Sequence, residues 1–95
     1  MKEDKDKIES SVCEACEVSI EDIHNKDTKH KVSLARAIIW YILHYEYRWS
    51  IATISKEYSR TERNIKYMIA KVRNYITFDK ATNKLYYKIR SSILR

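Results

Sequence analysis

The sequence predicts an all-α fold, a five- or six-helix bundle that contains a helix-turn-helix. Three observations lead there. Apolar residues recur at helical spacing, residues that can cap a helix precede most apolar segments, and the 95 residues show no strand-like alternation. A chain of this length suits one domain, residues 1–95. We divide it into an acidic first helix (1–18), the helix-turn-helix (50–76) and a C-terminal helix (77–95).

The first half of the chain is expected to hold three helices. One covers about Asp6–Cys16, and Ser19, with an acid three residues later, indicates the N-cap of a short second helix. Residues 25–31, NKDTKHK, have no apolar spacing and are expected to form a loop. Residues 32–47, VSLARAIIWYILHYEY, are apolar almost all round, which is typical of the central helix of a bundle.

The second half is expected to hold three more helices. Ser50 caps one that ends near Tyr58, and Thr61 caps one that runs to about Ile76. Thr77 or Asp79 caps the last helix. Its apolar residues are spaced by four, at Ala81, Leu85, Ile89 and Ile93.

Residues 50–72, SIATISKEYSRTERNIKYMIAKV, have the spacing of a helix-turn-helix. Such a unit needs a small residue where its helices cross, a tight turn four residues later and an aliphatic residue six further on. Ser55, Ser59 and Ile65 satisfy this spacing. The turn usually holds glycine because its φ tends to be positive, and a serine there costs on the order of 1 kcal/mol.

The second helix of this unit has a predicted buried stripe and an opposite polar face. The stripe comprises Ile65, Met68, Ile69, Val72 and Ile76. The N-terminal turns of a recognition helix enter the DNA major groove. The candidates for major-groove contacts are therefore Thr61, Glu62, Arg63, Asn64, Lys66 and Tyr67. Arg63 suits guanine, Glu62 suits the amino group of cytosine, and Tyr67 suits a thymine methyl or a phosphate. A solvated helix face is the alternative interpretation.

Charge is distributed unevenly along the chain. Residues 1–22 carry three lysines against eight acids, a net charge of −5, and the remainder carries 16 Lys and Arg against five acids, a net charge of +11. A strongly basic body favours a polyanionic partner such as nucleic acid. The absence of glycine excludes phosphate-cradling loops and dinucleotide fingerprints. We therefore predict no enzymatic activity.

The order of these segments resembles a known family. The stretch from about Ile8 to Ile76 is similar to the C-terminal DNA-binding domain of the bacterial replication initiator DnaA. The likeness lies in VCEACEVSIEDIHNK, in LARAIIWYIL and in SIATISKEY with the helix-turn-helix that follows. The resemblance implies a domain that binds double-stranded DNA.

Further contacts follow from the resemblance. Arg36 falls where the family's arginine enters the minor groove, and the basic loop that grips phosphates corresponds to Lys26, Lys29 and Lys31. Ser50 would contact the backbone beside the major groove, and Arg60 stands near the signature arginine. Arg73 is expected to contact phosphate for a different reason, because helical spacing places it on the outward face of the second helix.

The chain departs from the family where sequence specificity resides. The stretch from Ser59 to Ile65, SRTERNI, is one residue shorter than the family signature and lacks its glycine. The aspartate, histidine and threonines that read the initiator's DNA site in that family are also absent. Asp27 interrupts the basic loop. No ATPase region is present, so the resemblance implies an accessory, competing or regulatory DNA binder.

Two other patterns have plainer interpretations. Cys13 and Cys16 form a C-x-x-C, but only seven residues separate Cys16 from His24, which is short for a zinc finger, so we expect buried cysteines and no metal or other cofactor. The eight tyrosines suggest single-strand stacking, but most fit the core and its rim. Tyr86 and Tyr87 are expected to be exposed.

We expect a cytoplasmic, monomeric protein that does not enter membranes and that binds double-stranded DNA, with a replication or regulatory protein as a further partner. The main alternative is a protein-interaction module that uses its helical surface and its acidic N-terminal segment.

Overall fold

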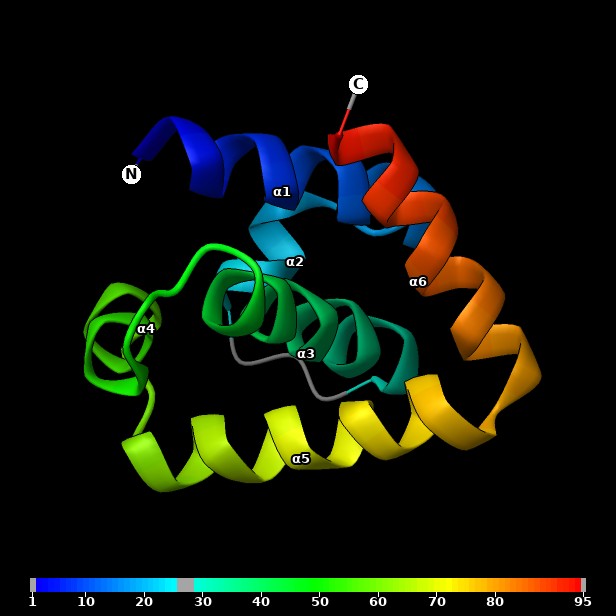
Figure 1. Cartoon of the computed structure of the whole chain (residues 1–95). Coiled ribbons are helices and arrows are strands. Elements are labelled where there is room, and N and C mark those ends of the chain that lie inside the picture. The colour runs from blue at the N-terminus through cyan, green and yellow to red at the C-terminus, as the bar shows by residue number, and fades with distance from the viewer. Residues whose placement is uncertain (1, 26–28, 95) are drawn as a thin grey trace.

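The chain folds into helices joined by short connections (Figure 1). The computed structural model describes residues 2–25 and 29–94, and within them the helices are α1 (Lys2–Cys16), α2 (Ile20–His24), α3 (His30–Tyr45), α4 (Ile51–Tyr58), α5 (Glu62–Phe78) and α6 (Lys80–Ile93). No strand occurs in these ranges, and the predicted all-α class is confirmed. Two boundaries differ from expectation. Helix α1 begins four residues earlier, and α3 begins at His30, inside the stretch expected to be a loop.

Helix α3 occupies the centre of the molecule, as its apolar circumference predicted. It contacts α1, α2, α4 and α5, while α6 packs against both α1 and α5. Figure 1 shows α1 and α5 on opposite sides of α3. The acidic first helix therefore lies away from the helix that holds the candidate reading face.

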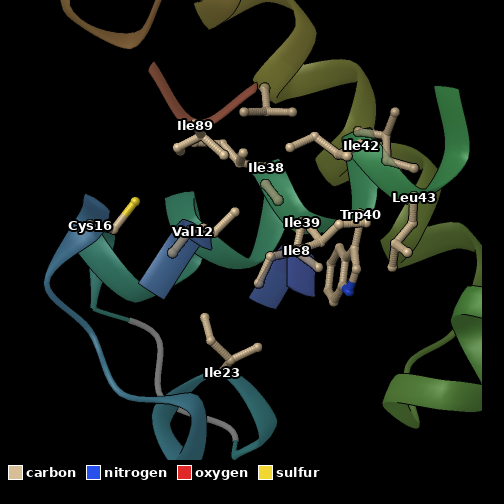
Figure 2. Close-up of a cluster of buried hydrophobic side chains, with 14 of the residues drawn as sticks. Ile8, Val12, Cys16, Ile23, Ile38, Ile39, Trp40, Ile42, Leu43 and Ile89 are labelled. Carbon is tan, nitrogen blue, oxygen red and sulfur yellow. The ribbon is translucent and has the colours of Figure 1, made fainter. Parts of the chain in front are cut away.

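The core is built on α3 and closed by side chains from the surrounding helices (Figure 2). Trp40 and Ile39 of α3 are almost completely buried, and Ile8, Val12 and Ile23 meet them from α1 and α2. Ile89 of α6 reaches the same cluster. Burying each large apolar side chain contributes roughly 1.5–3 kcal/mol, so these contacts fix how the helices are placed.

The predicted helix starts at Ser19, Ser50 and Thr61 are confirmed. In each case the side-chain oxygen accepts a hydrogen bond from the backbone N–H three residues later, at 3.0 Å, 3.0 Å and 3.1 Å respectively. Asp79, one of the two expected caps, begins α6, and its Oδ2 accepts from the Thr82 N–H at 3.0 Å.

Among the residues that the structure describes, Glu17, Arg48 and Ser59 have a positive φ, at 57°, 59° and 54°. Glu17 directly follows α1, Ser59 directly follows α4, and Arg48 lies in the connection between α3 and α4. A helix commonly ends with a residue in this left-handed conformation, and glycine usually occupies the position. Since the chain has no glycine, these residues adopt the conformation against their steric preference.

Cys13 and Cys16 are free and buried in the core, as expected. Burial, with the nearby Glu9 carboxylate as a second cause, raises the pKa of the Cys13 thiol to about 11. Burial also raises the pKa of Cys16. Both side chains are therefore protonated near neutral pH and pack as small apolar groups.

The buried stripe of α6 differs from the predicted one. Ala81 is exposed and Leu85 only partly buried, whereas Thr82 and Tyr86 are buried together with Ile89 and Ile93. A spacing of four residues drifts by about 40° at each step on a helix of 3.6 residues per turn, so a strict four-residue series cannot stay on one face. Tyr86 is thus not the exposed tyrosine that we expected. Its hydroxyl donates to Glu46 Oε2 at 2.6 Å.

No helix in the described part of the chain is both long and apolar enough to cross a bilayer.

Candidate nucleic-acid interface

The first helix of the helix-turn-helix is α4, which begins at Ser50. The Ser50 hydroxyl accepts from the Thr53 N–H and lies 2.8 Å from Thr53 Oγ1. Ile54 and Tyr58 are the buried residues of this short helix. The N-terminus of α4, with its unpaired backbone N–H groups, is exposed at Ser50.

The turn after α4 has the predicted geometry. Ser59 adopts the left-handed conformation, with φ 54° and ψ 45°. The Arg60 N–H donates to the Ser55 carbonyl at 3.0 Å, and the Ser55 hydroxyl donates to the Arg60 carbonyl. The small Ser55 at the crossing position therefore also closes the turn, which fixes the direction in which α5 leaves it.

Helix α5 begins after the Thr61 cap and turns a regular stripe toward the core. Ile65, Ile69, Val72 and Ile76 are buried at spacings of four, three and four, and Met68 is partly buried beside them. The predicted buried stripe is therefore confirmed, apart from the partial exposure of Met68. Because this stripe fixes the rotation of α5, it also determines which side chains face outward.

The outward face of the first turns of α5 is polar and available. Glu62, Arg63 and Lys66 are exposed, and none of them makes a side-chain hydrogen bond or ion pair within residues 2–25 and 29–94. Tyr67 is 61% exposed, and Lys71 Nζ lies 5.9 Å from the centre of its ring. Thr61 and Asn64 lie at the same end of the helix. Thr61 is exposed and Asn64 is partly buried.

Arg36 does not have the position expected for a minor-groove contact. It is 4% exposed, its Nε donates to the Ile23 carbonyl at 3.0 Å, and its Nη2 donates to the carbonyls of Asp22 and Asn25 at 3.1 Å and 3.0 Å. These are carbonyls that the short α2 leaves without helical partners. Arg36 thus joins the C-terminal end of α2 to α3, and the expected role is corrected to a structural one.

Arg60 is also engaged within the molecule. Its Nη2 donates to the Asn25 carbonyl at 2.8 Å, the same oxygen that accepts from Arg36. This contact ties the turn of the helix-turn-helix to the end of α2. The phosphate contact expected for Arg60 would have to use its remaining guanidinium N–H groups.

The three lysines assigned to the basic loop are placed differently from one another. Lys26 lies outside the described residues. Lys29 is exposed and directly precedes α3, whereas Lys31 lies in the first turn of α3 rather than in a loop. Lys31 Nζ is 3.9 Å from Glu17 Oε2 in an exposed ion pair. Such a pair contributes about 0–1 kcal/mol, so it does not prevent Lys31 from reaching a phosphate.

One set of contacts that positions α4 was not recognised in the sequence. Glu9 of α1 is 3% exposed, and its Oε2 accepts from the Tyr58 hydroxyl at 2.6 Å and lies 2.8 Å from His24 Nε2. The His24 and Tyr58 rings are stacked, with centres 5.1 Å apart. Burial and the hydrogen bond to Glu9 raise the pKa of Tyr58, which keeps its hydroxyl protonated.

Lys5 adds an exposed link between the same two helices. Its Nζ is 3.3 Å from Glu57 Oε2 and 5.8 Å from the centre of the Tyr58 ring. Together with Glu9, it anchors the C-terminal end of α4 to α1. The signal in the sequence was the position of Glu9, an acid directly beside Ile8 and three residues before Val12, on the buried side of α1.

Comparison with known protein families identifies a relationship. The family model of the bacterial DnaA protein helix-turn-helix matches residues 5–72, which run from α1 into α5 and stop before α6. No curated protein matches the chain significantly. The match covers well over half of the 95 residues and confirms the resemblance that the sequence indicated. The chain belongs to the bacterial DnaA helix-turn-helix family, a family of DNA-binding domains.

Proposed function

We propose that the chain binds double-stranded DNA by inserting the first turns of α5 into the major groove. The observation that carries this proposal is the outward face that begins at Thr61, where Glu62, Arg63 and Lys66 are exposed and have no partner in the described chain. A DNA major groove about 12 Å wide admits one α-helix. The buried stripe on the other side of α5 holds this face in a fixed orientation.

The proposed base contacts follow from the chemistry of these side chains. Arg63 can donate two hydrogen bonds to guanine O6 and N7, and Glu62 can accept from cytosine N4. Tyr67 can pack against a thymine methyl or donate to a phosphate. Thr61 and Asn64, at the same end of α5, are assigned to the same groove.

Phosphate contacts would supply most of the affinity. Ser50 with the N-terminus of α4, Lys29 and Lys31 near the start of α3, and Arg73 on α5 are assigned to the backbone on either side of the groove. The acidic α1 lies on the far side of α3 from α5, so its charge is kept away from the phosphates. Binding is therefore expected to weaken steeply with salt.

An accessory, competing or regulatory role fits this set of residues. The 95 residues contain no glycine, and a loop that cradles nucleotide phosphates needs glycines for close backbone approach. Occupying a DNA site without hydrolysing a nucleotide allows these residues to assist another DNA-binding protein or to exclude one.

The first experiment is selection of bound sequences from a pool of random duplexes, at low and at near-physiological salt. We expect one motif to become enriched and to persist at the higher salt. If no motif is enriched and binding is lost as the salt concentration rises, the basic surface binds DNA only non-specifically, and the proposal is refuted.

Arg63→Ala tests the assignment of an individual residue. We expect this variant to lose roughly 1–3 kcal/mol of binding free energy on the selected site and to relax one base position. Lys7→Ala, which removes an exposed cation from α1, is the matched control and should bind as the parent does. Equal losses for Arg63→Ala on every sequence would make Arg63 a phosphate contact instead.

Charge changes on α1 distinguish DNA binding from the alternative function, a protein-interaction module. Removing residues 1–18 would delete Ile8 and Val12 from the core, so truncation cannot test it. Glu3→Gln with Glu14→Gln changes two exposed acids and leaves the core intact. DNA binding should survive these changes, whereas a module that docks a basic partner through α1 should lose that partner.

A further inference from the structure

Aromatic side chains of α3 and α6 form a continuous series of ring contacts that the helix-turn-helix does not use. The ring centre of Tyr41 lies 4.9 Å from that of Tyr45 and 5.5 Å from that of Tyr86. Tyr86 lies 5.1 Å from Tyr87 in turn, and His44 lies 4.8 Å from Tyr45. We call Tyr45, Tyr41, Tyr86 and Tyr87 the aromatic track.

The inner rings of the track are held in place, and its ends are open. The Tyr86 hydroxyl is bound to Glu46, and burial raises the pKa of both Tyr41 and Tyr86. Tyr45 and Tyr87 are each 50% exposed. Rings that are exposed yet braced by neighbouring rings lose little conformational entropy when another flat group stacks on them.

A groove with a volume of about 540 Å³ runs along α5 beside Tyr45. The residues that line it include Lys66, Ile69, Arg73 and Phe78, and none of them is acidic. Phe78 is 83% exposed, the most exposed of the large apolar side chains in the described chain. The groove thus places a third open ring and two cations next to one end of the track.

The charges around the track are those of a polyanion-binding surface. Arg73 acts on the Tyr41 hydroxyl from α5 in the direction that lowers its pKa, although burial outweighs this effect. Helix α6 contains no acid between Lys80 and Ile93, and Lys84 is exposed. Lys88 is also exposed, but it lines a separate pocket with Glu14 and Glu17 of α1. Glu46 is in contact with the track, and its carboxylate already accepts from Arg90 Nε at 2.8 Å and from the Tyr86 hydroxyl.

We propose that this surface binds single-stranded nucleic acid, with bases stacked on Tyr45, Tyr87 and Phe78 and with phosphates near Arg73 and Lys84. Proteins that bind single strands combine a basic groove with exposed aromatic rings. The bases of a duplex have their faces covered by neighbouring base pairs, so a duplex could offer these rings no stacking partner. Arg73, Phe78, Lys84 and Tyr87 lie beyond Val72, outside the part of the chain that matches the family, whereas Tyr45 lies within it.

The exposed rings favour a single strand over an acidic protein segment. An acidic helix would need an apolar channel along which to lay its side chains, whereas the exposed rings at this surface lie beside cations such as Arg73. Stacking on an aromatic ring is available to every base, so the expected preference is for single strands in general rather than for a sequence.

The test measures binding of labelled oligothymidylate and of a duplex, by fluorescence anisotropy, at low and near-physiological salt. The double variant Tyr45→Leu, Tyr87→Leu removes the two rings but keeps apolar bulk, and it should bind oligothymidylate at least about tenfold more weakly. Tyr45→Phe with Tyr87→Phe keeps the rings and should bind as the parent does. Thermal unfolding of each variant shows whether the fold is retained.

The duplex surface and the single-strand surface share Arg73, so variants of other residues are used to distinguish them. Tyr67→Leu and Arg63→Ala, on the reading face of α5, should weaken duplex binding and leave oligothymidylate binding unchanged. The leucine double variant should weaken oligothymidylate binding and leave duplex binding unchanged. If the protein binds oligothymidylate but selects no duplex sequence, the proposed duplex function is refuted and this inference is still supported.

Three results would overturn the inference. One is equal binding of oligothymidylate by the leucine double variant and the parent, because stacking on the rings would then contribute nothing to binding. Another is failure of the parent to bind oligothymidylate at low salt. The third is tighter binding of an acidic amphipathic peptide that depends on Tyr45 and Phe78, which would assign the surface to a protein partner.

Discussion

The turn of the helix-turn-helix stores conformational strain at Ser59. Its φ of 54° and ψ of 45° lie in the left-handed region, which costs a residue with a Cβ roughly 1–2 kcal/mol. Glycine avoids this strain, but its unfolded chain has more freedom to lose, which costs roughly 0.5–1 kcal/mol. We therefore expect Ser59→Gly to raise the free energy of unfolding by about 0.5–1 kcal/mol.

Urea unfolding followed by far-UV circular dichroism measures this change. In a thermal scan it corresponds to a Tm increase of about 2–8 °C for a domain of this length. Ser59→Ala is the matched control, because it retains the Cβ and therefore the strain, and it should not be more stable than the parent. Ala52→Gly places a glycine on the exposed side of α4 and should lower stability by about 1 kcal/mol.

Equal stability of Ser59→Gly and Ser59→Ala would refute the strain argument. A Ser59→Gly variant that loses stability as Ala52→Gly does would show that position 59 behaves as part of the helix. Since glycine adopts the observed φ and ψ readily, Ser59→Gly should bind duplex DNA as the parent does.

Three further predictions concern buried and capping groups. Tyr58→Phe leaves the buried Glu9 carboxylate with one donor fewer and should lower the free energy of unfolding in urea by about 1.5–3 kcal/mol, with Tyr47→Phe as the control. Cys13, whose pKa is about 11, retains its proton as the pH rises through 9. It should therefore be alkylated roughly a hundredfold more slowly at about pH 9 than an unfolded cysteine, as peptide mass spectrometry can measure. The folded state favours the protonated form of Cys13 more strongly than the unfolded state does. This contribution to stability is present below about pH 9 and is lost as the pH rises through the folded-state pKa of about 11. Hydrogen bonds from Thr82 lower the pKa of Asp79, so its stabilising effect is present at neutral pH and is lost as pH falls through the lowered pKa. Asp79→Ala should accordingly lower the Tm at neutral pH and have little effect in strong acid.

Much of the helix-turn-helix was predictable because it depends on local geometry. The caps at Ser50 and Thr61, the turn at Ser59 and the stripe from Ile65 to Ile76 each involve residues within a few positions of one another. Helical spacing and cap chemistry act over that range, so they can be recognised in the sequence. The exposure of Arg63 and Lys66 then follows from the position of the stripe.

The partners of long polar side chains were not predictable in this way. Arg36 was expected at DNA and is instead bound to carbonyls 11 to 14 residues away. Glu9 meets Tyr58 across 49 residues, and Tyr86 meets Glu46 across 40. Each partner depends on which helices pack together, and no local pattern records that choice.

By itself the sequence determined the helical class, the helix starts and the helix-turn-helix. It also determined that residues 1–22 are acidic and that the rest of the chain is basic. These properties depend on residue spacing and composition, which the chain carries before it folds. Only the tertiary structure decided which cations remain on the surface and which serve the fold, and how rings from α3 and α6 meet in one track. The physical reason is that a buried polar group must find a partner within about 3 Å, and packing of the helices around α3 decides which groups come that close.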